Sequence, residues 1–147
     1  MEGLPEEQRA VIRPFLAGPG VFEYGRVSLA EVVRQKRLAS FHLYYTATPV
    51  ECDCISIRES ALLGALPVLS NHRVFAERPG LHLAGDPLSA ADAAAAAREL
   101  LVAVASGAAD ALREQLVREG EAAGEDGGGL FGGWAHVAAA WGRTLVP

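Results

Sequence analysis

The feature that most constrains the fold is an alternation of short apolar segments and helical segments joined by short links. Residues 41–45 are rich in aromatic side chains that favour strands, and residues 67–70 form a second apolar run. Between them, residues 55–63 have a helical pattern that stops at Gly64. Because strand–helix–strand units with short links place their strands in parallel, the sequence predicts a parallel sheet with helices packed on it.

The segments before residue 41 extend this pattern. Residues 5–16 carry apolar side chains at helical spacing, and residues 21–24 are predicted to form a short strand. Ser28 and Glu31 have the spacing of a capping box at the start of a helix over residues 29–38. The predicted buried stripe of that helix consists of Leu29, Val32 and Val33.

The segments after residue 70 are mostly helical. Residues 81–83 predict a weak fourth strand, Ser89 would cap a helix to Ser106, and a second helix covers residues 108–119. A glycine-rich break over residues 124–129 precedes a last predicted helix. Its apolar face would be formed by Trp134, Val137, Trp141 and Leu145.

The predicted fold class is therefore α/β, a partial Rossmann-like parallel sheet flanked by helices, with a helical C-terminal tail. The sheet core would cover about residues 21–87 and the tail residues 88–147, within one incomplete domain of residues 1–147. Proline lacks an amide donor, so Pro67 is expected at the first position of its strand. Three or four strands are fewer than a complete doubly wound domain carries, and we expect its opening half to be missing.

Composition narrows the class of function. Half of the 147 residues are hydrophobic, which indicates a folded core, and a net charge of −5 disfavours binding to nucleic acid. The one basic cluster, Arg34, Lys36 and Arg37, is interpreted as the solvated edge of a helix.

No membrane span or export signal is predicted, so we expect a cytoplasmic protein. The alanine-rich residues 90–105 include charged side chains, and acidic residues follow Met1 closely. Cys52 and Cys54 form a lone C-x-C, which is too few ligands for structural zinc and too close for an unstrained disulfide. We interpret both as free thiols.

The loop after residues 41–45 is the first candidate site, because open parallel sheets bind ligands at the carboxyl ends of their strands. Glu51 and Glu59 lie on either side of a predicted helix N-terminus in this stretch. The free amides and partial positive charge of such a terminus suit a diphosphate. The two carboxylates could accept hydrogen bonds from sugar hydroxyls.

The same residues resemble a known family. The stretch reads Glu51-x7-Glu59, then Ser60-Ala61-x-x-Gly64-x-x-Pro67-Val68. It is similar to the E-x7-E and E-A-x-A-x-G-x-P-V signature of the C-terminal, donor-binding domain of retaining GT-B glycosyltransferases, of the glycosyl transferase family 1/4 type. The resemblance extends from about residue 21 to the end of the chain. It includes Gly25-Arg26-Val27 with the helix after it, Leu43-Tyr44-Tyr45, and a closing helix with Trp134 and Trp141.

The resemblance implies a role for each matching residue. Glu59 would bind the ribose of the nucleotide, and Glu51 would contact the donor sugar. Backbone amides near Cys54, Ile55 and Ser56 would hold the diphosphate, whose charge grows as it leaves. A nucleoside-diphosphate sugar would be the substrate, with no bound metal or cofactor needed.

The implied activity is transfer of a hexose to an unknown acceptor, and the chain would be inactive alone. A missing N-terminal part would have to supply the acceptor site, because positioning contributes most of the rate of a transfer reaction. The alternative is a non-catalytic binding or interaction module with a glycosyltransferase-like fold. In either case a protein partner or the missing domain would cover the open edge of the sheet.

The chain also departs from the family pattern. Cys54 lies near the position where the family has a glycine that lets the backbone approach the phosphates. Asp53 adds a negative charge beside the expected diphosphate. The Arg and Lys side chains that clamp the phosphates in the family would come from loops before Met1.

Several of these residues also have purely structural interpretations. Ser56 and Glu59 have capping-box spacing, and Arg58 could be a surface charge or a phosphate or partner contact. We interpret His42 as a packed side chain. His72 and Arg73 follow a strand at the ligand-facing edge, although an ordinary loop accounts for them as well.

Overall fold

The computed structural model describes residues 5–47 and 54–126. The chain divides into two compact units, Met1–Val32 and Val33–Pro147, and the boundary falls within helix α2 (Leu29–Leu38). The three strands and the longest helices all belong to the second unit. The candidate site therefore has to be sought there.

The first unit contains helix α1 (Glu6–Leu16), as the sequence predicts. None of its described residues is buried, and Phe15 on the expected apolar face of α1 is 73% exposed. The strand predicted over residues 21–24 is wrong, because these residues have no strand structure. Phe22 is 79% exposed, so β-favouring side chains there have no neighbouring strand to stabilise them.

Helix α2 begins where the sequence predicts. The Glu31 amide donates a hydrogen bond of 3.3 Å to Ser28 Oγ, which is one half of the expected capping box. The predicted buried stripe is only partly correct, because Leu29 is 72% exposed whereas Val32 and Val33 are half-buried.

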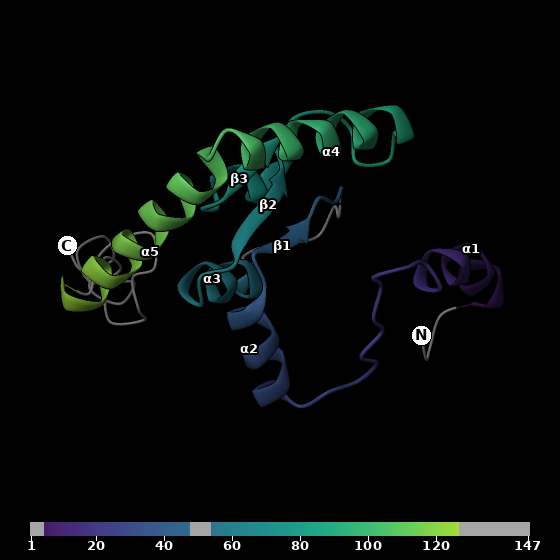
Figure 1. Ribbon diagram of the computed structural model, residues 1–147, viewed down its shortest axis with the longest axis horizontal. Helices are drawn as coiled ribbons and strands as arrows, with labels where there is room; N and C mark the ends of the chain where they lie inside the picture. Colours follow the sequence, from purple (N-terminus) through teal and green to yellow (C-terminus); the bar gives the residue numbers. More distant parts are fainter. Residues whose placement is uncertain (1–4, 48–53, 127–147) are drawn as a thin grey trace, which may run out of the picture. The chain divides into compact units, whose positions relative to one another are not determined.

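The second unit is built on a three-stranded parallel sheet, which confirms the predicted fold class (Figure 1). The strands are β1 (Phe41–Tyr44), β2 (Leu66–Ser70) and β3 (Leu81–Leu83), in the order β1-β2-β3. Leu43 pairs with Val68, which in turn pairs with Leu81.

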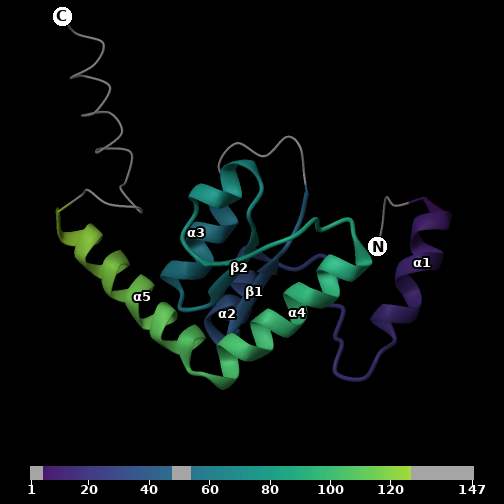
Figure 2. The same cartoon turned by 90° about the horizontal axis from the view of Figure 1, so that it is seen from above.

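Helices cover both faces of this sheet (Figure 2). On one face, α3 (Ile55–Leu62) and the 3-10 helix η1 (Arg73–Glu77) pack against the strands. This core contains Cys54, Ile57, Leu69 and Phe75, with Tyr44 against them. The other face carries α4 (Ala90–Ala105) and α5 (Ala108–Asp126). The buried residues of that face are Leu66, Val68, Leu83, Ala96, Ala109 and Leu116.

Gly64 and Pro67 explain how α3 ends and how β2 begins. Gly64 follows α3 with a φ of 88°, a left-handed conformation that suits glycine and ends the helix as predicted. Pro67 is expected at the first position of its strand, but it is the second residue of β2. This position tolerates proline because Leu66 already donates to Ser40 on the β1 side, while pairing with β3 starts only at Val68.

The helical tail is confirmed as far as it is described. Ser89 Oγ caps α4 by accepting from the Asp92 amide, and α4 ends before Ser106. Helix α5 continues to Asp126, past the predicted end at residue 119. The predicted helix with Trp134 and Trp141 lies outside the described residues. In the part of the chain that is described, no helix has the length and apolar character needed to cross a membrane.

Candidate functional site

Two side-chain hydrogen bonds tie together the carboxyl ends of the three strands. Ser70 Oγ, at the end of β2, donates to the Thr46 carbonyl after β1, at 2.6 Å. The Tyr45 hydroxyl donates to the Ala84 carbonyl after β3, at 2.8 Å. Ser70 is fully buried, so its hydroxyl is satisfied by this bond away from water. The residues that directly follow the three strands, Tyr45, Thr46 and Ala84, are therefore tied to one another across this edge of the sheet.

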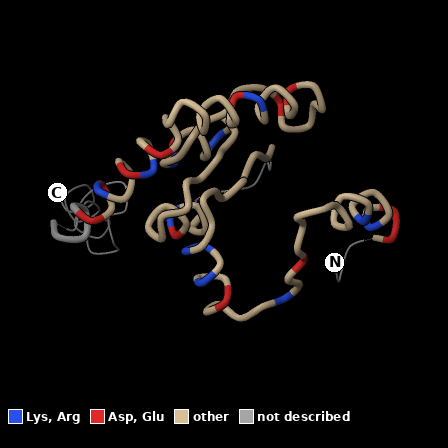
Figure 3. The backbone as a smooth tube through the Cα atoms, in the orientation of Figure 1, with Lys and Arg blue, Asp and Glu red and all other residues tan. Residues whose placement is uncertain are grey.

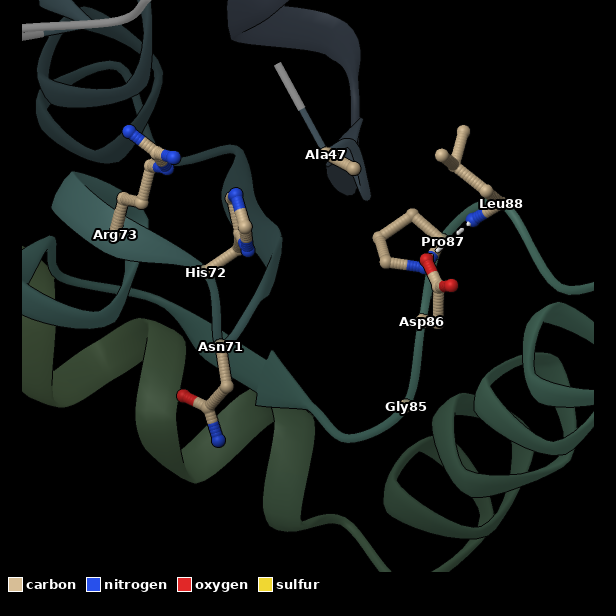
Figure 4. Close-up of a pocket in the computed structure, with 8 residues that line it drawn as sticks. All are labelled: Ala47, Asn71, His72, Arg73, Gly85, Asp86, Pro87 and Leu88. Carbon is tan, nitrogen blue, oxygen red and sulfur yellow. Dashed lines mark hydrogen bonds between the residues drawn. The ribbon is translucent and has the colours of Figure 1, made fainter. Parts of the chain in front are cut away.

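These loops surround a hollow of about 630 Å³ (Figure 4). Ala47 contributes from the end of β1, and residues 71–73 and 85–88 contribute from the loops after β2 and β3. Figure 4 shows His72 and Arg73 across the hollow from Asp86 and Leu88. The carboxyl edge of an open parallel sheet is where ligands bind in this class of fold, so the hollow is a candidate site.

The wall after β3 is shaped by two backbone amides that donate to carboxylates, one on α4 and one in the loop itself. Asp92 Oδ2 accepts from the Asp86 amide at 3.0 Å, and Asp86 Oδ1 accepts from the Leu88 amide at 2.9 Å. Gly85 has a φ of 96°, and a Cβ there would lie 2.8 Å from the Asp92 Cβ. Only glycine fits this close approach.

The opposite wall contains one strained backbone position. Arg73 has a φ of 50°, which is unusual for a residue with a side chain. Such strain is often found at functional sites, where the surrounding structure maintains it. From the sequence, His72 and Arg73 are expected at the ligand-facing edge but are interpreted as an ordinary loop, whereas in the structure both line the hollow.

Helix α3 begins close to this edge. Its N-cap is Cys54, which is buried and packs with Leu69, near the carboxyl end of β2, and with Phe75 of η1. The Ile57 amide makes the first helical bond, to the Cys54 carbonyl at 3.0 Å. The first amides of an α-helix have no partner within the helix, which makes those of Cys54, Ile55 and Ser56 candidates for binding a ligand. Ile55 is 66% exposed, whereas the Cys54 thiol belongs to the core.

The Glu59 carboxylate does not form the capping box suggested by its spacing from Ser56, since the N-cap of α3 is Cys54, two residues before Ser56. It instead forms an ion pair with Lys36 of α2, with Oε2 at 2.9 Å from Nζ. The same ammonium donates to Ser56 Oγ at 2.9 Å and to the Ser56 carbonyl at 3.0 Å. The Lys36 side chain is only 11% exposed, so its interpretation as a solvated charge is wrong.

A second network lies beneath this one. Ser60 is fully buried, and its hydroxyl donates to the Ser56 carbonyl at 2.8 Å. His42 Nδ1 lies 2.7 Å from Ser60 Oγ. Because the serine proton is already committed, Nδ1 carries the hydrogen of this bond. The pKa of His42 is lowered, first by burial and then by the positive charge of Lys36, so the ring is neutral at pH 7. The packed role expected for His42 fits this geometry.

The remaining predicted site residue, Glu51, lies outside the described residues together with Cys52 and Asp53. Among the residues that are described, no three His, Cys, Asp or Glu side chains gather as metal ligands would. Acidic and basic residues alternate along α5 from Asp110 to Glu119 (Figure 3). A comparison with known protein families, with curated proteins and with solved structures found no match.

Proposed function

We propose that this chain is the nucleotide-sugar-binding part of a retaining glycosyltransferase of the GT-B type. The observation that supports the proposal best is the hollow at the carboxyl ends of three parallel strands, with the start of α3 beside the same edge. The resemblance of residues 51–68 to the donor-binding signature supports it independently.

The proposed chemistry is electrostatic. The amides of Cys54, Ile55 and Ser56 would donate to the diphosphate, and the partial positive charge of the helix start would favour the leaving nucleotide. Glu59 would accept hydrogen bonds from the ribose hydroxyls. Its side chain is 45% exposed, which leaves it accessible to a ligand while Lys36 binds one of its oxygens. Glu51 would contact the donor sugar.

Transfer of the sugar also needs an acceptor held in line with the donor, and positioning of this kind contributes a large part of catalysis. We assign that role to a further domain or partner. The chain alone is therefore proposed to bind a donor without transferring its sugar, and we expect a hexose as the transferred group.

The proposal is tested by calorimetric binding of uridine and guanosine diphosphates to three proteins: wild type, Glu59→Gln and Glu114→Gln. Hydrogen bonds to charged groups contribute about 1.5–3 kcal/mol, so Glu59→Gln should weaken binding about tenfold or more. Glu114 is a matched control, because its exposed side chain also forms an ion pair, with Arg118 one turn away on α5. The donor-site proposal fails if wild type binds neither nucleotide, or if Glu59→Gln binds as tightly as Glu114→Gln.

An interaction module without catalysis is the second candidate. It is favoured by Leu43, which is 65% exposed on β1 although parallel strands are normally covered on both faces. In the described sheet β1 pairs with β2 alone, so its other edge is open to a further strand.

A further inference from the structure

The ammonium of Lys36 has no hydrogen left for a ligand. A lysine ammonium carries three N–H donors. Three acceptors lie within 3.0 Å of Nζ: the Ser56 carbonyl, Ser56 Oγ and Glu59 Oε2. The side chain is also 11% exposed, so a bound molecule has little access to it. Apart from the electrostatic attraction of its charge, Lys36 can therefore act on a ligand only through its hydrogen-bonded partners Ser56 and Glu59.

The same bonds determine what these two partners can offer. Ser56 Oγ accepts from Lys36, so its own hydrogen is directed away from the ammonium and can be donated to another acceptor. Glu59 is held through Oε2, and its carboxylate accepts further hydrogen bonds on the exposed part of the side chain. Lys36 thus orients the Ser56 hydroxyl as a donor and the Glu59 carboxylate as an acceptor, and these two groups lie about one helical turn apart on α3.

We propose that Lys36 is the positioning residue of the donor site. It directs the Ser56 hydroxyl toward the diphosphate and holds the Glu59 carboxylate toward the ribose diol. This inference rests on the proposed nucleotide-binding function. It adds that recognition of the ribose 2′-hydroxyl depends on a lysine 23 residues away in the sequence, on another helix.

The backbone under Ser56 reinforces this arrangement. The Ser56 carbonyl accepts from both Lys36 and the buried hydroxyl of Ser60, which is held in turn by His42. Two donors on one carbonyl fix the first turn of α3 relative to α2 and β1. The positions of Ser56 and Glu59 are therefore set before a ligand arrives, which lowers the entropic cost of binding.

The test measures the ratio of dissociation constants for uridine diphosphate and its 2′-deoxy analogue. If guanosine diphosphate binds more tightly, the guanosine pair replaces it. The ratio is measured for wild type, Lys36→Met, Glu59→Gln and the double variant. Arg37→Met is the control, because Arg37 is exposed on the same helix. Lys36→Gln is used as well in case Lys36→Met fails to fold, and thermal unfolding of each variant reports stability separately.

We expect the wild type and Arg37→Met to prefer the ribonucleotide about tenfold, and Lys36→Met to lose most of this preference. The double variant should resemble Glu59→Gln, because Lys36 acts through Glu59. A merely structural lysine would lower the unfolding temperature and leave the ratio unchanged. That result overturns the positioning role alone, whereas absence of nucleotide binding in the wild type overturns the proposed function and this inference together.

Discussion

Replacing Gly85 with alanine tests whether the loop after β3 has the tight geometry that shapes the hollow. Gly85 has a φ of 96°, and an added Cβ would lie 2.8 Å from Asp92 Cβ and 3.2 Å from the Tyr45 hydroxyl. Both neighbours hold the loop, since Asp92 accepts from the Asp86 amide and Tyr45 donates to Ala84. The methyl group must therefore displace the groups that fix this wall.

Gly107→Ala is the matched control. Gly107 also has a positive φ, 77°, but a Cβ there would meet nothing within 4 Å. The control therefore measures only the cost of placing alanine in a left-handed conformation, about 1–2 kcal/mol. Overpacking at Gly85 should add about 1–3 kcal/mol, so Gly85→Ala should destabilise the protein by about 2–5 kcal/mol.

Urea denaturation measures both effects as changes in the free energy of unfolding, with the slope against urea checked for constancy. Equal losses for the two variants would refute the reasoning, because they would mean that the contact with Asp92 does not exist in solution. Gly85→Ala should also weaken nucleotide binding, because Gly85 lines the hollow that we assign to the donor site.

Two further predictions concern pH and association. The pKa of His42 is below its unfolded value of 6.5, so the folded state binds a proton less readily, and stability should fall as the pH drops below 6.5. His42→Asn keeps an N–H that can be donated to Ser60 but does not titrate in this range. Its unfolding temperature should therefore fall less than that of wild type between about pH 8 and about pH 5. An equal fall of the unfolding temperature in both proteins would contradict this. Leu43→Lys should reduce self-association in light scattering, since it places a charge on the open strand, whereas Leu62→Lys on α3 should change it less. Equal effects of the two would contradict a role for the β1 edge.

The sequence predicts the second unit better than the first, for a physical reason. The strands over residues 41–45, 67–70 and 81–83 have partners on the same sheet, and Gly64 supplies the left-handed stop that the helix before it needs. Residues 21–24 have the same kind of side chains but pair with no strand. Strand propensity depends on neighbours that a local pattern does not reveal.

The site is less predictable than the fold because its decisive contacts join distant residues. The spacing of Ser56 and Glu59 suggests a capping box, yet the N-cap of α3 is Cys54 and both side chains bind Lys36. In the sequence, Lys36 is one charge in a basic cluster on an amphipathic helix. Its burial depends on how α2 meets α3, which is a tertiary property.

At the end of α5, the sequence predicts less regular structure than the protein forms. Glycine disfavours helix, and residues 124–129 are predicted as a break. The helix nevertheless passes Gly120, which is buried, and Gly124 before it ends at Asp126. Flanking Glu and Ala residues favour helix strongly enough to continue it through single glycines.

Titration of 15N-labelled protein with uridine or guanosine diphosphate, followed through its backbone amide signals, tests the central claim most directly. A diphosphate bound at the start of α3 should shift the amides of Cys54, Ile55 and Ser56 first, and Glu59 with them. Unchanged signals at these four residues, or shifts confined to α1 in the first unit, would contradict the account.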